Sequence, residues 1–503
     1  MSRTVVVIGG GIAGLVAARH LAAGGADVTV YEAREQVGGR VRSRSEAGYT
    51  LDRGFQVLFT GYPAVQRELD LEALDLRRFK PGAVIARPGQ RSVLADPLGD
   101  PTAAIASLRN TEVTFTDKLR TLALRQHLGT RAYGDLFEGP DASIRDYLRD
   151  WGFSEQYISN FVAPFYGGIT LDRSLATSKR VFEYTFKCLS DGDSAVPAAG
   201  MGAIADQLAE RARNAGATIQ TDEPVHELSP TDGDVVVDSD STRRAVDAAV
   251  VATPPQTAAQ LTGVDAIPTD GIGCVTQHYR LPDAEPLDTG KRLLLNAGDD
   301  EPNTVVPMSE VAPEYAPDGG LLLNATFLDA DAEDTDSETL AEQTRSALSS
   351  WYPDRRFERL EPLATDRIPF AQFAQPPGMH DALPGVRDGD DGSIWPASTP
   401  SGRRFRARCR AVERQPLLCL KTAELPSSTT RYSWLRTDSS RGNHRASSPS
   451  PSQTTGCIDD RSLISGDCRS LARRLLHSTP PAHRVNAGTV RMSPPRYWPS
   501  PNR

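Results

Sequence analysis

The chain has 503 residues, of which 56 are Lys or Arg and 65 are Asp or Glu, giving a formal net charge of −9, and 39% are hydrophobic. A chain of this length exceeds one compact core, so we expect two or more domains. No run reaches the roughly 18 apolar residues of a transmembrane helix, and the N-terminus has no charged-then-apolar leader. We therefore expect a cytoplasmic protein.

The charge is unevenly distributed. Residues 1–400 have a net charge of −22 and residues 401–503 one of +13. The acidic part contains five lysines against 32 arginines, a bias that predicts a halophilic protein, although an ordinary acidic surface is the alternative. A negative field disfavours nucleic acid as a partner. Only Cys188 and Cys274 fall in this part, so we expect no disulfide framework.

The first forty residues predict a strand–helix–strand unit. Residues 4–8 are typical of a buried parallel strand, residues 15–23 of an apolar helix and residues 27–31 of a second strand. The glycine-rich turn at 9–14 joins the first strand to the helix, and Glu32 follows the second strand.

The turn has the pattern G-x-G-x-x-G, in which each glycine has a separate task. Gly9 permits the tight turn, Gly11 lets a pyrophosphate approach the backbone, and Gly14 lets the helix pack closely on the strand. The helix N-terminus attracts phosphate oxygens. Glu32 can accept hydrogen bonds from ribose hydroxyls, so the unit predicts dinucleotide binding, with an ordinary glycine turn as the alternative.

The sequence continues through Ala33-Arg34 to Gly38-Gly39-Arg40-Val41. Here it resembles the superfamily of flavin amine oxidases, phytoene desaturases and protoporphyrinogen oxidases. The resemblance implies FAD, with the second glycine pair and Arg40 at the diphosphate and ribityl chain. Arg34 could instead bind the 2′-phosphate of NADP, but Glu32 would repel that phosphate.

Further segments extend the resemblance. Residues 51–57 resemble the family segment that reaches the flavin ring, where Gly54 would allow close backbone approach and Phe55 would cover the ring; a strand-end glycine turn is the alternative. Val225 matches the position that meets adenine, and residues 248–255 match a strand and turn beside the diphosphate. The implied cofactor-binding residues are Gly9, Gly11, Ile12, Ala13, Gly14, Glu32, Ala33, Arg34, Gly38, Gly39, Arg40, Val41, Gly54, Phe55, Val225 and Ala252.

The resemblance also implies an α/β fold with a Rossmann-like (GR2-type) FAD-binding domain, an interleaved α+β substrate domain and a disordered C-terminal tail. The predicted segments are 1–57, 195–263 and 365–392 for the FAD-binding domain, 58–194 and 264–364 for the substrate domain, and 393–503 for the tail. Apolar spacing predicts helices over 117–128 and 144–161, which either line an apolar tunnel or pack in an ordinary core.

From about Trp395 the composition changes to Ser, Arg and Pro, which predicts disorder. Four cysteines there have spacings that fit no zinc pattern, and a basic RNA-binding arm is another alternative. A shifted reading frame explains the change better. Residues 404–416, read from the third nucleotide of each codon, permit Ser-Val-Gln-Gly-Ala-Val-x-Ser-Gly-Arg-Ala-Ala-Ala, which is similar to the closing motif of the superfamily. We therefore predict a frameshift between about 390 and 395.

The resemblance implies hydride transfer to flavin, which leaves the protein to supply a dry pocket and orientation. Amine oxidases of the superfamily place a lysine in the strand that corresponds to residues 273–280, and this chain has none there. The difference favours a desaturase-like or porphyrinogen-oxidase-like reaction on a small apolar substrate. Such a substrate is compatible with peripheral membrane contact of the protein. An amine oxidase, a nicotinamide dehydrogenase and an inactive flavoprotein are the alternatives. His278 is either a proton acceptor or a hydrogen-bonded strand histidine, and we predict no catalytic residue and no metal site.

Overall fold

The computed structural model describes residues 2–95, 112–231, 234–282, 285–298, 300–317, 320–328 and 330–384. The chain divides into two units, Met1–Ser428 and Thr429–Arg503, and every described residue belongs to the first. The predicted tail at 393–503 and the predicted frameshift therefore lie outside the described residues.

A four-stranded parallel sheet carries the N-terminal motif. Its strand order is β10-β2-β1-β14, and all three pairings are parallel. The helices α1 and α9 follow β1 and precede β10 in the chain. The bounds are Thr4–Ile8 for β1, Ile12–Ala23 for α1, Asp27–Tyr31 for β2, Gly202–Asn214 for α9, Thr218–Gln220 for β10 and Ala248–Val251 for β14.

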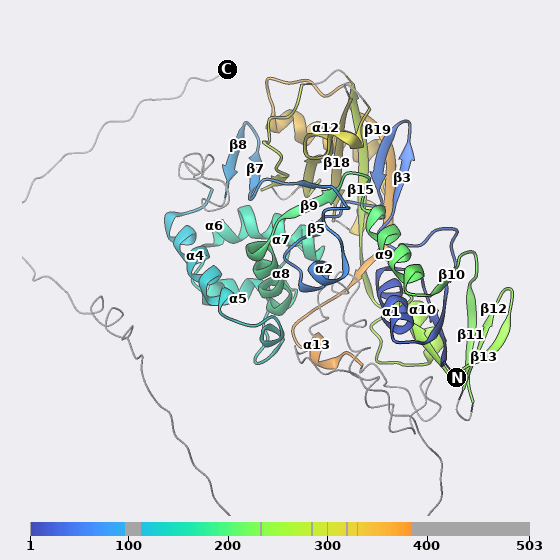
Figure 1. Ribbon diagram of the computed structural model, residues 1–503. Coiled ribbons are helices and arrows are strands. Elements are labelled where there is room, and N and C mark those ends of the chain that lie inside the picture. Colours follow the sequence, from blue (N-terminus) through green and yellow to red (C-terminus); the bar gives the residue numbers. More distant parts are fainter. Residues whose placement is uncertain are drawn as a thin grey trace, which may run out of the picture. The chain divides into compact units, whose positions relative to one another are not determined.

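This sheet is buried on both faces, as parallel sheets are. Val5 and Val7 pack with α1 and α9, whereas Val6 and Ile8 pack against a three-stranded antiparallel sheet and α10. Figure 1 shows that antiparallel sheet beside α10, at the edge of the molecule that holds the N-terminus. Its strands are β11 (Val225–Pro230), β12 (Val235–Ser239) and β13 (Arg243–Val246), and α10 spans Pro255–Thr262.

A second, seven-stranded sheet has the order β19-β15-β18-β17-β16-β7-β8. One face packs on helix α12, where Val275, Leu323 and Trp351 share a hydrophobic cluster. Side chains alternate along a strand, so the neighbouring residues face the other way. The bounds are Ala83–Arg87 for β7, Gln90–Leu94 for β8, Gly271–Pro282 for β15, Leu294–Asn296 for β16, Thr304–Pro307 for β17, Gly320–Phe327 for β18, Ser337–Trp351 for α12 and Glu361–Phe373 for β19.

A group of helices lies beside this sheet, and α4 and α5 both contact α8 (Figure 1). The bounds are Phe115–Gly129 for α4, Ile144–Asp150 for α5, Glu155–Tyr157 for α6, Ile158–Val162 for the π-helical η2, Ala163–Thr170 for α7 and Lys179–Asp191 for α8. The predicted helix over 117–128 is confirmed within α4. The prediction of one helix over 144–161 is wrong, because Gly152 has a φ of +79° and Ser154 caps a new turn.

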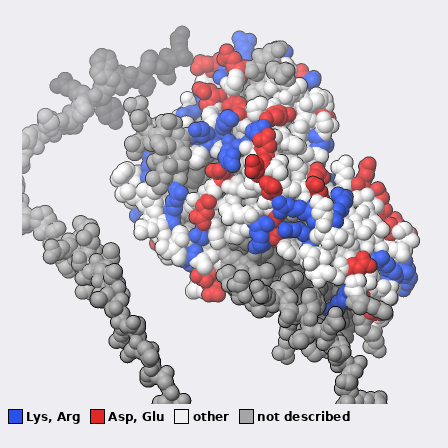
Figure 2. Space-filling view, in the orientation of Figure 1, with Lys and Arg blue, Asp and Glu red and all other residues white. Residues whose placement is uncertain are grey.

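Smaller elements complete the described residues. They are β3 (Ser43–Glu46), β4 (Tyr49–Asp52), β5 (Leu58–Phe59), α2 (Pro63–Glu68), β6 (Leu76–Arg78), η1 (Gly134–Phe137), β9 (Ser194–Pro197), α11 (Met308–Val311), η3 (Pro313–Tyr315), η4 (Ala330–Glu333) and α13 (Met379–Ala382). Within the described ranges, no helix is long and apolar enough to cross a bilayer. Figure 2 shows acidic and basic side chains interspersed over the visible face, and the halophilic character stays a prediction.

The predicted α/β class with a Rossmann-like unit is confirmed by the parallel sheet and its βαβ crossover. Strands from 1–57 and 195–263 share the four-stranded sheet. Strand β19, from the segment at 365–392, instead pairs with β15 in the seven-stranded sheet. The division into an FAD-binding and a substrate domain stays a prediction.

Candidate cofactor and substrate site

The glycine turn between β1 and α1 has little room for side chains. Gly9 has a φ of +105°, and a Cβ there would lie 2.8 Å from the carbonyl oxygen of Ala252. A Cβ at Gly14 would lie 1.9 Å from the carbonyl oxygen of Gly9. At these two positions the neighbouring backbone leaves no room for a side chain, so glycine is required for folding, as the motif predicts.

Gly11 differs from the other two glycines. The nearest atom to a Cβ built there is Gly39 Cα at 4.0 Å, so the described residues leave space at this position. Gly11 is also the N-cap of α1, it makes no side-chain capping bond, and the first turn of α1 has no acidic residue. The space and the positive end of the helix dipole suit a phosphate group.

Glu32 lies at the carboxyl end of β2 and is 5% exposed. Its carboxylate accepts hydrogen bonds from the backbone amides of Gly10, at 2.7 Å, and Arg34, at 3.1 Å. These two bonds fix the carboxylate beside the glycine turn. A carboxylate has about four acceptor positions, so capacity remains for ribose hydroxyls.

The other predicted segments gather around the same turn. The Gly38 amide donates to the Gly10 carbonyl at 2.8 Å, and the Gly38 backbone bridges to that of Gly11, which places the second glycine pair directly against the first motif. The Ala252 amide donates to the Ile8 carbonyl. Just before Val225, the amides of Asp222 and Glu223 donate hydrogen bonds to the carbonyl groups of Arg34 and Glu32.

An arginine whose Nε is buried supports an anion at this place. Nε of Arg42 is buried and has no hydrogen-bond partner among the described residues. Burial lowers the pKa of Arg42, the positive charges of Arg34 and Arg53 lower it further, and the carboxylates of Glu32 and Asp366 act in the opposite direction. Three neighbouring guanidinium groups are stabilised by a negative ligand, so the residues present fit the diphosphate of a dinucleotide.

The loop that contains Gly54 and Phe55 is fixed by buried polar groups. Asp366 on β19 accepts a hydrogen bond from the Gly54 amide at 3.0 Å and pairs with Arg44 and with His278. Burial acts to raise the pKa of Asp366, but hydrogen bonds from His278 and Gly54, with the charges of His278 and Arg44, lower it to about 2. Phe55 is held by its amide, which donates to Thr276 Oγ1 at 3.2 Å.

His278 is fully buried, and it does not line the cavity described below. Its Nδ1 lies 2.9 Å from Asn324 Oδ1 and its Nε2 lies 3.1 Å from Asp366 Oδ2. Both ring nitrogens are therefore hydrogen-bonded inside the sheet. This geometry fits the hydrogen-bonded strand histidine and not a proton acceptor for substrate.

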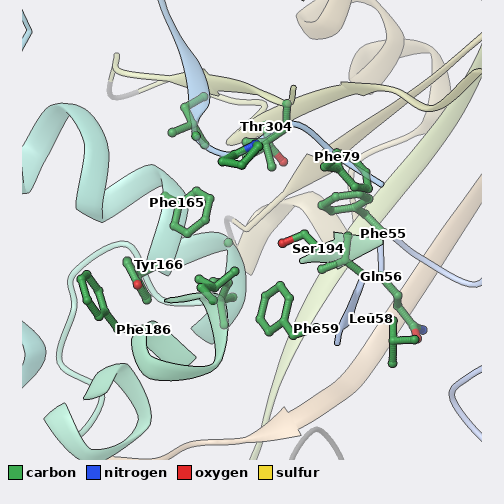
Figure 3. A pocket seen from close by; sticks show the side chains of 18 of the residues that line it. Phe55, Gln56, Leu58, Phe59, Phe79, Phe165, Tyr166, Phe186, Ser194 and Thr304 are labelled. Atoms are coloured by element: carbon green, nitrogen blue, oxygen red, sulfur yellow. The ribbon is translucent and has the colours of Figure 1, made fainter. Parts of the chain in front are cut away.

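A cavity of about 590 Å³ begins at the predicted cofactor residues Ile12, Arg40 and Val41 and extends between the helices and the seven-stranded sheet. Aromatic side chains form much of its wall. Figure 3 shows Phe59, Phe165 and Phe79 around the open space, with Phe55 beside Phe79. The aromatic lining residues are Phe55, Phe59, Tyr62, Phe79, Phe115, Tyr157, Phe161, Phe165, Tyr166 and Phe186.

The described cavity wall holds the lysines Lys80 and Lys118 but few acidic groups. Asp193 is the only carboxylate among its described lining residues, and it pairs with Arg78 at 2.9 Å. Burial raises the pKa of the Cys274 thiol to about 11, so this lining group stays protonated near neutral pH. Within the described ranges, no group of three or more His, Cys, Asp or Glu could hold a metal.

The sequence interpretation missed several residues of the site. Arg42 carries a detectable signal, because it lies two positions after Arg40 in the second glycine segment. The sheet residues Thr276, Thr304 and Thr326, which line the cavity, carry none, since their shared position depends on strand register.

A parallel sheet with a glycine-rich turn at a helix N-terminus, an acidic residue after the second strand and an adjoining apolar cavity define a dinucleotide-dependent enzyme of the Rossmann-like class. The chain belongs to the family of flavin containing amine oxidoreductases, whose family model matches residues 12–396. Its cofactor is FAD. The match ends next to Trp395, where the composition of the sequence changes.

Curated relatives cover only part of the chain. A carotenoid 3,4-desaturase from Haloarcula japonica is 28% identical over 258 residues, which are 45% of this chain and 50% of the relative. A putrescine oxidase from Kocuria rosea is 42% identical over 94 residues, which are 18% of this chain and 20% of the relative. The chain thus spans half or less of the length of these relatives.

Solved structures share the fold over most of the chain. An oxidoreductase from Methanosarcina mazei matches with a TM-score of 0.59 and 20% identity, over 74% of this chain and 90% of that one. A putrescine oxidase bound to putrescine matches with a TM-score of 0.54 and 16% identity, over 81% of this chain and 98% of that one. The predicted fold is confirmed by these likenesses.

Proposed function

We propose that the chain is an FAD-dependent oxidoreductase that takes a hydride from an apolar substrate, in the manner of a desaturase or a porphyrinogen oxidase. The observation that carries this proposal is the aromatic cavity that opens from the predicted cofactor residues. A cavity of this size and lining holds a drug-sized apolar molecule with most of its surface buried.

Each part of the chain has a role in this reaction. The glycine turn and Arg42 bind the diphosphate, and the Asp366–Gly54 hydrogen bond fixes the loop that carries Phe55. The aromatic walls exclude water and orient the substrate. Bound FAD supplies the hydride acceptor, so no strong base is needed from the cavity wall.

The alternative of an amine substrate has weaker support. A carboxylate partner would stabilise a protonated amine in an apolar cavity, and the described lining offers only Asp193, which already pairs with Arg78. Strand β15 also places Cys274 and Thr276, and no lysine, on the cavity wall. Among the relatives, the carotenoid 3,4-desaturase supports an apolar substrate and the putrescine oxidase supports an amine.

Anaerobic reduction of the bound flavin tests the proposal. The purified holoprotein is mixed with a carotenoid precursor, a porphyrinogen or putrescine, and the loss of the oxidised-flavin absorption band is followed. We expect reduction by one of the apolar compounds and none by putrescine. Rapid reduction by putrescine alone would favour the amine-oxidase alternative.

We also propose that helix α4 contacts a lipid bilayer, from which an apolar substrate enters. Phe115, Leu119 and Leu122 are 66%, 52% and 46% exposed and lie on one face of α4, at spacings of four and three residues. All three also line the cavity, so the exposed stripe is continuous with its interior. Vesicle sedimentation of the double variant Phe115→Ser/Leu119→Ser should show weaker binding than the parent; equal binding would exclude this surface.

A further inference from the structure

A row of three threonines crosses the wall of the cavity. Thr276 on β15 lies directly opposite Thr326 on β18, and Thr326 lies directly opposite Thr304 on β17. Residues opposite one another in an antiparallel ladder point to the same face of the sheet. All three line the cavity, on the face of the sheet opposite to α12. We call these residues the threonine row.

The hydroxyl groups of the row are used differently. Thr276 Oγ1 accepts a hydrogen bond from the Phe55 amide at 3.2 Å. Thr326 is 5% exposed, and its Oγ1 is buried with no hydrogen-bond partner among the described residues. Thr304 is equally buried, and Figure 3 shows it at the sheet side of the cavity.

A buried hydroxyl without a partner is unfavourable, and most buried polar groups in folded proteins have one. If the cavity held only hydrocarbon, valine would fill the position of Thr326 with nearly the same shape and without that cost. Thr326 lies between Thr276 and Thr304 on a wall that is otherwise mainly apolar and aromatic. Its hydroxyl can therefore make a directional contact that the apolar side chains of this wall cannot make.

We propose that Thr326 and the adjacent Thr304 form a subsite for an oxygen atom of the substrate. The substrate is then a predominantly apolar molecule that carries a hydroxyl or carbonyl oxygen, and not a pure hydrocarbon. This proposal rests on the proposed function. It also explains how a long and uniform chain is kept from sliding: hydrophobic contacts do not fix a register along the cavity, whereas one hydrogen bond does.

The position of the subsite determines which part of the substrate reacts. The threonine row continues through Thr276 to the Phe55 loop and to Asp366, which lies opposite Thr276 on β19. An oxygen held by Thr326 is therefore two strands from β19. The carbons nearest to that oxygen are placed along the same row as the loop that the family resemblance assigns to the flavin.

The test measures ligand binding to the oxidised holoprotein with a matched pair of probes. Farnesol and farnesene have the same fifteen-carbon isoprenoid skeleton, and farnesene has a terminal diene in place of the allylic hydroxyl group of farnesol. The dissociation constants are obtained from perturbation of the flavin spectrum or from quenching of protein fluorescence, which requires no turnover. We expect the parent protein to prefer farnesol.

Thr326→Val should weaken farnesol binding roughly tenfold, the effect of about one hydrogen bond, and leave farnesene binding unchanged. Thr326→Ser retains the hydroxyl and should retain the preference. Thr29→Val, a buried threonine on β2 that does not line the cavity, is the matched control and should change neither constant.

Other outcomes overturn the proposal in distinguishable ways. If Thr326→Val changes the dissociation constants of farnesol and farnesene equally, or changes neither, the Thr326 hydroxyl does not form a hydrogen bond with a substrate oxygen. If it alters the flavin spectrum before any ligand is added, the hydroxyl serves the cofactor. If the parent protein binds farnesene as tightly as farnesol, the proposed function stands and the threonine subsite is rejected. If the parent protein binds neither probe, both the proposed function and the subsite are rejected.

Discussion

The glycine turn and the apolar cavity differ in how the sequence specifies them. At the turn, Gly9, Gly11 and Gly38 lie within thirty positions of one another in the sequence. Their lack of a side chain lets backbone segments, and the expected phosphate, approach closely. In the cavity, the Phe55 amide and Thr276 Oγ1 meet across 221 positions, and their contact depends on the register of two sheets and a loop. A short motif therefore identifies the cofactor region, whereas only the folded chain identifies the substrate region.

Substitutions in the glycine turn should have the largest effect, and they separate binding from folding. Gly11→Val places a side chain where the structure has space, so we expect a folded protein that binds FAD at least about 100-fold more weakly, near 3 kcal/mol. Gly14→Val should fail to fold, because its Cβ would meet the Gly9 carbonyl. FAD content and circular dichroism measure the two effects. Full FAD retention by Gly11→Val would show that the diphosphate lies elsewhere.

A substitution in the cavity wall should weaken binding of the substrate and leave binding of the cofactor unchanged. Phe165→Ser removes an aromatic side chain from the wall and should weaken binding of an apolar ligand roughly 30-fold, about 2 kcal/mol. Phe165→Leu keeps an apolar side chain and should weaken binding less. The measurement is ligand titration of the holoprotein, with FAD content as the control. A parallel loss of FAD would mean that the two regions are not separable.

Arg42, whose Nε is buried, tests the cofactor region without changing a glycine. Arg42→Met keeps the length of the side chain and removes its charge, so we expect FAD to bind about tenfold more weakly, or about 1.4 kcal/mol. Arg355→Met is the matched control, because the described partners of the Arg355 guanidinium are the carbonyl groups of Glu285 and Pro286 and the Tyr352 ring, and none of these residues lines the cavity. Equal FAD affinity in the two variants would show that Arg42 does not contribute to FAD binding.

The smallest effect concerns acid stability. Asp366 has a folded pKa of about 2, below its ordinary value near 3.9, so its stabilising contribution is present above pH 4 and is lost as pH falls toward 2. Asp366→Asn should reduce the stability lost between pH 6 and pH 3 by about 1 kcal/mol. Urea unfolding at the two pH values measures this difference. An unchanged pH dependence would show that the Asp366 carboxylate is not selectively stabilised in the folded chain.

The sequence predicts the regions whose structure depends on neighbours along the chain. The strand–turn–helix from Thr4 to Ala23 and the helix within α4 follow from hydrophobic periodicity and glycine positions. The break near Gly152 was missed, because apolar spacing continues across a glycine that takes a positive φ only in the folded chain. Thr326 and Thr304 have no sequence signature either, since only strand pairing places them together.

The hydrogen bond from Arg40 to the Ala371 carbonyl joins residues 331 positions apart, and the pair of Arg44 with Asp366 joins residues 322 positions apart. During synthesis on a ribosome, the N-terminal motif therefore emerges long before β19. The segment that contains Arg40 and Arg44 can form its hydrogen bonds only after β19 has been made. Contacts of such long sequence separation form late and slow the completion of folding. The cofactor region is thus the first part of the enzyme to be made and among the last to be finished, and chaperones have that interval in which to bind it.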